Sequence, residues 1–319
     1  MDPVLEGVLF PLLKFLDPEY IAETGLMEIN CNEPGKIWLE YSDQGYESVH
    51  IPELTISFWG RLCNVLAACS GQFYDAYSIP IVSAKLPYGH RFEGMVNSAS
   101  ETGLSVSIRM QREAPLSFSD FGLTKMEADF LVEKISTGAN IVISGGTSSG
   151  KTTLANLLVK HIPLEKRIFL IEDTRELNIP HENKLSFVVA RNDREGETIL
   201  GYERVIDHAM RSRPDQILLG EISIKNAHPC LLLLNTGHKG LLTTIHSNSP
   251  DMVLDEGFYQ RIELAGKQID RESLSHYLRK VIDVIVQVHK TSSGTREVTE
   301  IWTNQTQSNV RGVQLLKAA

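Results

Sequence analysis

The chain has 319 residues, a length that suggests two domains, each able to bury a hydrophobic core of its own. Hydrophobic residues make up 42% and charged residues 22% of it, which is ordinary for a soluble globular protein. The formal net charge of −9 offers no basic footprint for DNA or RNA, so direct nucleic-acid binding is not expected.

Acidic charge is concentrated in the first third of the chain. Residues 1–113 hold 7 Lys and Arg against 15 Asp and Glu, a net charge of −8, and the remainder has a net charge of −1. Most of these acidic side chains are expected to form a solvated surface.

The same residues have the pattern of a small α+β domain. An Asn-Glu-Pro-Gly turn at residues 32–35 joins its first two strands. Helices are predicted at residues 4–16 and 56–69, and strands at residues 27–31, 36–40, 81–87, 91–98 and 104–110. Residues 114–120 are predicted to be a linker, and strands and helices then alternate through residues 121–319, which favours a parallel sheet.

Several features indicate a cytoplasmic protein. The N-terminus, Met-Asp-Pro, lacks the basic region of a secretory signal, and the apolar stretch at residues 8–16 is too short to span a bilayer. The four cysteines form no CxxC pair, so we expect reduced thiols and neither a zinc site nor a disulfide framework.

Residues 145–152 read GGTSSGKT and match the phosphate-binding loop GxxxxGK[ST]. A β-branched strand at residues 140–144 precedes the loop and a helix at residues 153–160 follows it, so a chance Gly/Ser-rich turn is the weaker interpretation. The backbone N–H groups of such a loop surround phosphate oxygens, and the helix N-terminus adds about half a positive charge. The nucleotide-binding residues predicted here are Gly145, Gly146, Thr147, Ser148, Ser149, Gly150, Lys151, Thr152 and Thr153.

ATP and Mg2+ are the cofactors that this loop predicts. Lys151 is expected to reach the β- and γ-phosphates, and the hydroxyl of Thr152 to take a position on Mg2+.

Three later strands each end in ionisable residues. Apolar runs at residues 167–171, 216–220 and 241–245 predict these strands. The residues that follow the three runs are, in order, Glu172 with Asp173, Glu221, and His246. A capping carboxylate or a core histidine would explain any one of them. Because parallel α/β sheets bind ligands at the carboxyl ends of their strands, the set together predicts a site beside the phosphate loop.

The roles follow from what phosphoryl transfer requires. Glu221, where a Walker B acidic residue should end a strand, is predicted to be the general base. Thr152, Glu172 and Glu221 are the predicted metal ligands, and Asp173 pairs with Glu172 for the metal–water network or for positioning. His246 is predicted to donate to the γ-phosphate or to respond to its loss.

Arginines and one further histidine are additional candidates. Arg91, Arg109 and Arg112 cluster near the end of the acidic first domain. The clustering predicts that Arg91 and Arg109 face the nucleotide across the domain junction, with surface ion pairs as the alternative, while the role of Arg112 stays open. His238 is either a nucleotide-binding residue or a turn histidine that caps a helix.

Taken together, four motifs resemble those of the secretion ATPase superfamily. They are Walker A (GGTSSGKT), the Asp box (IEDTREL, 171–177), Walker B (RPDQILLGEI, 213–222) and the His box (NTGHKGLLTTIHSNSP, 235–250). The His box is most similar to that of the type IV secretion ATPases of the VirB type. MEINCNEPGKIWLE (27–40), GHR (89–91) and SIR (107–109) resemble the N-terminal signature of the same family.

The resemblance implies a RecA-like ATPase domain in a homo-hexameric ring whose N-terminal and C-terminal domains form two tiers. It implies peripheral association with the cytoplasmic face of the inner membrane, beside the inner-membrane components of a type IV secretion machine. There the enzyme would hydrolyse ATP to drive substrate transfer or pilus biogenesis. It also implies that Arg91 and Arg109 reach the nucleotide and that Glu172, Glu221 and His246 serve catalysis.

One departure from the family pattern keeps alternatives open. Ser223 stands where family members usually carry an arginine after GEI, so either Lys225 compensates or the enzyme is slower. The alternatives are a type IV pilus-type motor, a nucleotide-gated docking platform with slow hydrolysis, and a DNA or RNA translocase, which the acidic balance disfavours. The sequence does not identify the transported substrate or the subunit that supplies each arginine.

Overall fold

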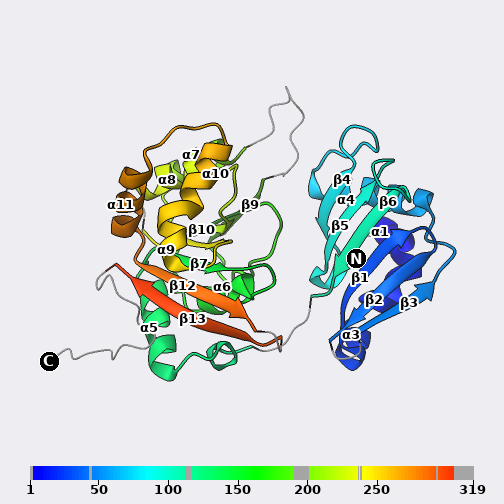
Figure 1. The fold of residues 1–319 in the computed structure, drawn as a ribbon, viewed down its shortest axis with the longest axis horizontal. Coiled ribbons are helices and arrows are strands. Elements are labelled where there is room, and N and C mark those ends of the chain that lie inside the picture. The colour runs from blue at the N-terminus through cyan, green and yellow to red at the C-terminus, as the bar shows by residue number, and fades with distance from the viewer. Residues whose placement is uncertain are drawn as a thin grey trace. The chain divides into compact units, whose positions relative to one another are not determined.

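The computed structural model describes residues 3–42, 45–111, 116–189, 201–235, 237, 239–291 and 294–304. Arg112 and His238, both singled out above, lie outside the described residues. Contacts divide the described chain into two compact units, one up to residue 111 and one from residue 116 onward, and each is described by itself (Figure 1). Within these ranges, no helix is long and apolar enough to cross a membrane.

The first unit is an antiparallel sheet of six strands in the order β3-β2-β1-β6-β5-β4. Its strands are β1 (Leu26–Glu33), β2 (Lys36–Tyr41), β3 (Gly45–His50), β4 (Ile81–Lys85), β5 (Arg91–Val96) and β6 (Leu104–Arg109). Its helical segments are α1 (Pro3–Leu9), a 3₁₀ turn (Phe10–Leu12), α2 (Leu13–Leu16), α3 (Pro18–Thr24), α4 (Ile56–Ser70) and a second 3₁₀ turn (Pro87–Gly89).

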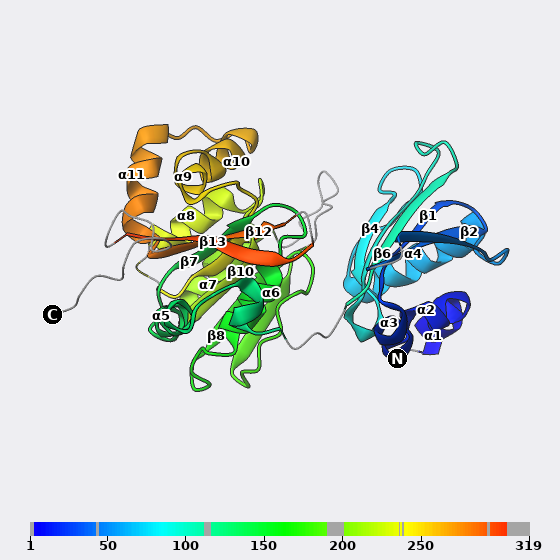
Figure 2. The ribbon, with the colours of Figure 1, turned by 60° about the horizontal axis from the view of Figure 1, so that its bottom comes forward.

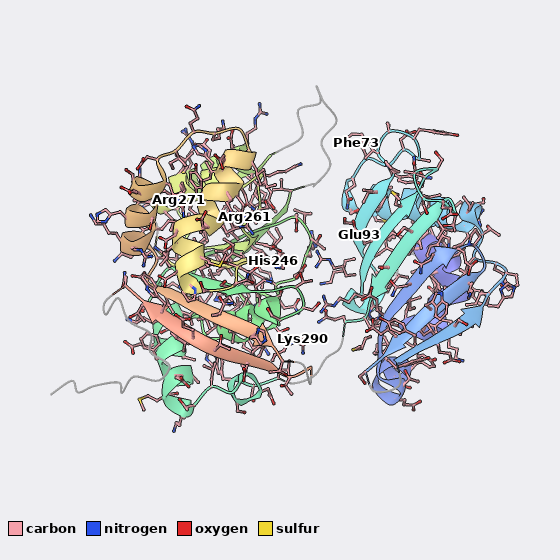
Figure 3. All side chains as sticks on the ribbon, viewed as in Figure 1. Phe73, Glu93, His246, Arg261, Arg271 and Lys290 are labelled. Atoms are coloured by element: carbon pink, nitrogen blue, oxygen red, sulfur yellow. The ribbon has the colours of Figure 1, made fainter. Side chains whose placement is uncertain are left out.

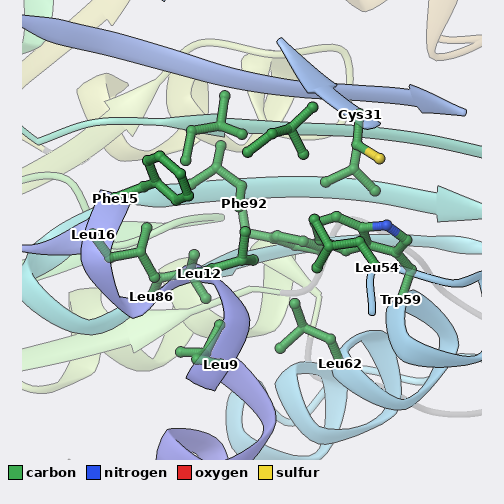
Figure 4. Packing of buried hydrophobic residues seen from close by; sticks show 14 of the residues in the cluster. Leu9, Leu12, Phe15, Leu16, Cys31, Leu54, Trp59, Leu62, Leu86 and Phe92 are labelled. Carbon is green, nitrogen blue, oxygen red and sulfur yellow. The ribbon is translucent and has the colours of Figure 1, made fainter. Parts of the chain in front are cut away.

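Side chains on β2, β5 and β6 alternate between a buried and a more exposed face. The buried face packs on the helices, where Trp59 of α4 lies beside Phe92 of β5 and both are fully buried (Figure 4). The single helix predicted over residues 4–16 is wrong in one respect. It is interrupted at Phe10–Leu12, because Pro11 has no N–H to donate to the preceding turn. Strand β3 was not predicted from the sequence.

The second unit is a sheet of seven strands in the order β13-β12-β7-β11-β10-β8-β9. Neighbouring strands are parallel except for the antiparallel pair β12 and β13. The strands are β7 (Ile141–Gly145), β8 (Ile168–Glu172), β9 (Lys184–Val188), β10 (Gln216–Glu221), β11 (Leu242–Ile245), β12 (Val284–Lys290) and β13 (Arg296–Thr303).

Helices cover both faces of this sheet. Figure 2 shows α5 and α6 on one side and α8, α10 and α11 on the other. The helical segments are a 3₁₀ turn (Phe118–Phe121), α5 (Lys125–Ser136), α6 (Lys151–Val159), α7 (Tyr202–Arg211), α8 (Ala227–Asn235), α9 (Pro250–Met252), a π-helical turn (Val253–Gly257), α10 (Phe258–Leu264) and α11 (Arg271–Val281). Strands β7, β8 and β11 are buried along their whole length, as a parallel sheet covered on both faces requires. The predicted mainly parallel α/β architecture is confirmed, although β9, β12 and β13 were not assigned from the sequence.

Candidate functional site

The phosphate loop joins the end of β7 to the start of α6. Gly145 must lack a side chain, because a Cβ there would lie 2.3 Å from the carbonyl oxygen of Val288. Gly150, which caps α6, has a φ of 96°, a left-handed conformation that other residues rarely adopt. These glycines let the backbone turn tightly at a helix N-terminus, where N–H groups and the helix dipole attract phosphate.

Lys151, the first residue of α6, folds back over this loop and is only 7% exposed. Its Nζ donates to the carbonyl oxygens of Gly145 at 3.0 Å and Gly146 at 2.9 Å. Burial lowers the pKa of Lys151, whereas the nearby carboxylates of Glu221 and Glu176 oppose that shift. An ammonium held by backbone carbonyls in this position is able to exchange them for phosphate oxygens.

Lys151 at the start of α6, His246 directly after β11 and Glu221 at the end of β10 form a chain of contacts. Nζ of Lys151 lies 3.2 Å from Nδ1 of His246, and Nε2 of His246 lies 3.2 Å from Oε1 of Glu221. Because an ammonium only donates, Nδ1 accepts, and Nε2 carries the proton that is donated to Glu221. Burial, and after it the Lys151 cation, lowers the pKa of His246, which favours this neutral form. The structure thus brings together three residues that the sequence placed on separate elements.

A register shift near the end of β10 positions Glu221 at this site. Leu219 of β10 pairs with Thr243 of β11, and Glu221 pairs with the next residue, Thr244. Gly220 therefore has no partner in β11 and is an extra residue, as in a β-bulge. The hydroxyl of Thr244 donates to the carbonyl oxygen of Gly220 at 2.9 Å. Fully buried Asn226 donates from Nδ2 to the carbonyl oxygen of Glu221 at 2.8 Å. The backbone that carries Glu221 is therefore held by side chains on both sides.

The acidic residues after β8 occupy different places. Glu172 is 2% exposed, and its Oε1 accepts the backbone N–H groups of Glu176 and Leu177, both at 2.9 Å. Glu176 in turn accepts the hydroxyl proton of Thr152 at 3.0 Å. Asp173 follows β8 and is half-buried. Sequence reasoning missed Glu176; its only signal was a carboxylate in the turn that follows Glu172.

Thr152 and Glu176 supply the oxygen donors that Mg2+ prefers. In nucleotide sites Mg2+ is bound by one or two carboxylates together with substrate phosphates. Among the described residues, no cluster of three or more His, Cys, Asp or Glu side chains is arranged to hold a metal ion by itself. A magnesium ion at Thr152 therefore fits this chain as a partner of the nucleotide.

A pocket of about 280 Å³ opens beside the phosphate loop. Gly146 and Thr147 of the loop form one part of its wall, and His246 forms another. Arg261 of α10 lines the same pocket. The pocket thus joins the phosphate loop to the ends of the neighbouring strands.

The two candidate arginines of the first unit lie directly opposite each other, Arg91 on β5 and Arg109 on β6. Lys85 is the cross-strand neighbour of Arg91, and Glu28 that of Arg109, so the four residues form one row across the sheet. The row lies on the polar face, because the adjacent Phe92 of β5 is buried in the core. The row thus carries three basic side chains and one carboxylate, that of Glu28.

Comparison with known proteins gives consistent matches over most of the chain. The family described as "Type II/IV secretion system protein" matches residues 18–292. Conjugal transfer protein TrbB of Rhizobium radiobacter is 33% identical over 286 residues, covering 86% of this chain and 83% of that protein. Type IV secretion system protein VirB11 of Bartonella henselae is 28% identical over 323 residues, covering 89% of each.

Solved structures share the fold, and one of them serves as an example. The Legionella pneumophila ATPase DotB superposes with a TM-score of 0.61 at 17% identity, covering 92% of this chain and 81% of that one. At that identity the likeness concerns the fold alone, and it confirms the fold class that the sequence predicted.

Proposed function

We infer that this chain, which belongs to the type II/IV secretion system protein family, is the ATP-hydrolysing motor of a type IV secretion or conjugation machine. The family match and the relatives confirm the secretion-ATPase assignment and the enzymatic activity that the four motifs predicted. We further propose a homo-hexamer that uses Mg2+ and associates peripherally with inner-membrane components of that machine at the cytoplasmic face. The names of the VirB11 and TrbB relatives, a type IV secretion system protein and a conjugal transfer protein, support the assignment to such a machine.

The observation that carries the proposal is the convergence of Lys151, His246 and Glu221 at the phosphate loop, through two contacts of 3.2 Å. A lysine for the phosphates, a carboxylate for water and a histidine between them are the groups that hydrolysis of a phosphoanhydride needs. All three lie within the second unit.

We propose that phosphate oxygens replace the carbonyls of Gly145 and Gly146 as partners of the Lys151 ammonium. That movement takes the ammonium away from Nδ1 of His246. The imidazole donates to the γ-phosphate once its proton is on Nδ1 instead of Nε2, because only a protonated ring nitrogen donates. Glu221 then accepts a proton from the attacking water as the general base. Mg2+, when bound, neutralises charge on the phosphates.

The carboxylate beside the magnesium position is, in this proposal, Glu176. Its contact of 3.0 Å with the hydroxyl of Thr152 supports that role. Glu172, which the sequence placed at the metal, instead positions Glu176 by accepting two backbone N–H groups of the turn. Asp173 retains its predicted place in the surrounding water network.

Arg91 and Arg109 are proposed to add positive charge at the nucleotide from the first domain, residues 1–113. Their direct cross-strand pairing on the polar face of the sheet supports this assignment. Arg-to-phosphate contacts are bidentate and strong, so two adjacent guanidinium groups suit a triphosphate.

A steady-state ATPase assay tests the proposed function. Removing the general base lowers turnover by about 10² to 10⁴-fold, so Glu221→Gln should lose hydrolysis on that scale and still bind ATP. A folded hexamer of the wild-type chain that hydrolyses no ATP would overturn the proposal. Near-normal turnover by Glu221→Gln would instead show that another residue is the base.

The same proteins separate the alternatives. Turnover that partners leave unchanged, combined with partner affinity that depends strongly on nucleotide, would favour the docking platform. Affinity capture with ATP-bound Glu221→Gln protein should recover inner-membrane components of a type IV secretion machine. Recovery of pilus platform proteins would indicate the pilus-type motor.

A further inference from the structure

Arg261 of α10 donates to three backbone carbonyls around the proposed active site. Its Nε donates to Ile222 at 3.0 Å, its Nη1 to Gly257 at 2.7 Å and its Nη2 to His246 at 3.1 Å. A guanidinium presents its N–H groups in one rigid plane, so these carbonyls are held in a fixed mutual arrangement. Figure 3 labels Arg261 and His246 near each other in the second unit.

Two of the three carbonyls belong to the strand ends that carry the reacting side chains. Ile222 directly follows Glu221 at the end of β10, and His246 directly follows β11. The N–H of Ile222 also donates to the carbonyl oxygen of Thr244 at 2.7 Å, so the two ends already approach each other. Arg261 adds a second, rigid connection between the two strand ends.

The charge of Arg261 acts on the same pair. Its side chain is half-buried, and its guanidinium interacts electrostatically with the carboxylate of Glu221. Arg261 also lines the pocket that Gly146 and Thr147 of the phosphate loop share with His246. The hydrogen bonds and the positive charge of the Arg261 guanidinium therefore act where β10, β11 and the phosphate loop meet.

We propose that Arg261 is a positioning residue for ATP hydrolysis, which holds the Glu221–His246 contact in place through the carbonyls of Ile222 and His246. The inference rests on the proposed function. Lysine would preserve the charge but not the planar fork, because an ammonium is a single point donor on a flexible stem. Glutamine would preserve neither the charge nor the reach.

The test compares Arg261→Gln and Arg261→Lys with the wild-type hexamer in kcat, KM, ATP affinity and melting temperature. A displacement of catalytic groups by about 1 Å costs roughly 100-fold in rate, so Arg261→Gln should lower kcat by about 10- to 100-fold. The dissociation constant for a fluorescent ATP analogue should stay within about twofold, since the interaction serves the transition state. Arg261→Lys should fall between the glutamine variant and wild type.

Arg279→Gln is the matched control. Arg279 of α11 is a similarly half-buried arginine whose guanidinium contacts Asp251 and Asp255 instead of strand ends. It should keep wild-type kcat. A fall in kcat equal to that of Arg261→Gln would mean that any disturbance of this helical layer slows turnover, and it would overturn the inference.

Further outcomes would also test the inference. Wild-type kcat in both Arg261 variants overturns the inference, as does a parallel loss of ATP affinity, kcat and melting temperature, which marks a purely structural role. If Arg261→Gln does not fold, Arg261→Lys decides alone. A crystal structure of the variant is independent of turnover, and a retained Glu221–His246 contact near 3.2 Å would overturn the inference. Absence of turnover in the wild-type protein would instead refute the proposed function.

Discussion

Substitutions at Glu172 and Glu176 should have opposite effects on stability and on catalysis. Glu172 is buried and accepts two backbone N–H groups, whereas Glu176 is half-buried and contacts the hydroxyl of Thr152. The first is expected to build the turn after β8 and the second to act at the nucleotide. Alanine and glutamine variants at the two positions separate these roles.

The magnitudes follow from the hydrogen bonds. Glu172→Ala leaves two N–H donors without their acceptor, that of Leu177 buried and that of Glu176 partly buried. A buried donor left unpaired costs about 1–3 kcal/mol and a partly buried one less, so the free energy of unfolding should fall by roughly 1–4 kcal/mol. Glu172→Gln keeps an oxygen in the same place and should reduce kcat by less than about tenfold. Glu176→Gln removes a charge at the proposed magnesium position and should reduce kcat by about 10- to 100-fold.

Urea unfolding of the whole chain measures the free energy of unfolding, followed through the transition of the second unit. A steady-state phosphate-release assay measures kcat. The free energy of unfolding of Glu176→Gln should lie within about 0.5 kcal/mol of wild type, which makes it the control for Glu172→Ala. If Glu172→Gln abolished turnover while Glu176→Gln remained active, the assignment would be reversed and Glu172 would be the direct participant.

Three other measurements test separate parts of the structure. Chelation of Mg2+ with EDTA should stop ATP turnover without unfolding the chain, and added Mg2+ should restore it; turnover that persists would exclude the proposed metal dependence. Gly145→Ala should lower the melting temperature and abolish ATP binding, because the added Cβ would lie 2.3 Å from the carbonyl oxygen of Val288, and unchanged binding would contradict that account of the loop. Burial lowers the pKa of His90, whose Nε2 donates to Leu16 at 2.8 Å while its Nδ1 accepts the N–H of Gln111 at 2.9 Å. The unfolded chain therefore binds the proton more readily, and stability should decline as pH falls below the ordinary histidine pKa of about 6.5. Melting temperatures between pH 7.5 and 5.5 check this, with a flatter profile expected for His90→Gln and a flat wild-type profile counting against it.

The sequence by itself determined the elements whose signals are local. The phosphate loop depends on glycines at fixed spacing, and the alternation of apolar strands with helices predicts a parallel sheet. In such a sheet the residues that end neighbouring strands meet at one edge, so the order of the motifs alone predicts that Glu221 and His246 lie beside Lys151. Their motifs also identified the family.

Only the tertiary structure decided which side chains meet. The turn after β8, held by Glu172, brings Glu176 rather than Glu172 to Thr152, and periodicity carries no information about an irregular turn. The pairing of Arg91 with Arg109 depends on the register of the β5–β6 hairpin, which the loop at residues 97–103 and the buried face of the strands set. Arg261 is fifteen residues beyond His246, after the π-helical turn Val253–Gly257, and only the packing of α10 onto the sheet brings its guanidinium to the strand ends. Spacing along the chain predicts contacts within a strand or helix, whereas contacts between segments that irregular turns connect depend on how the whole core packs.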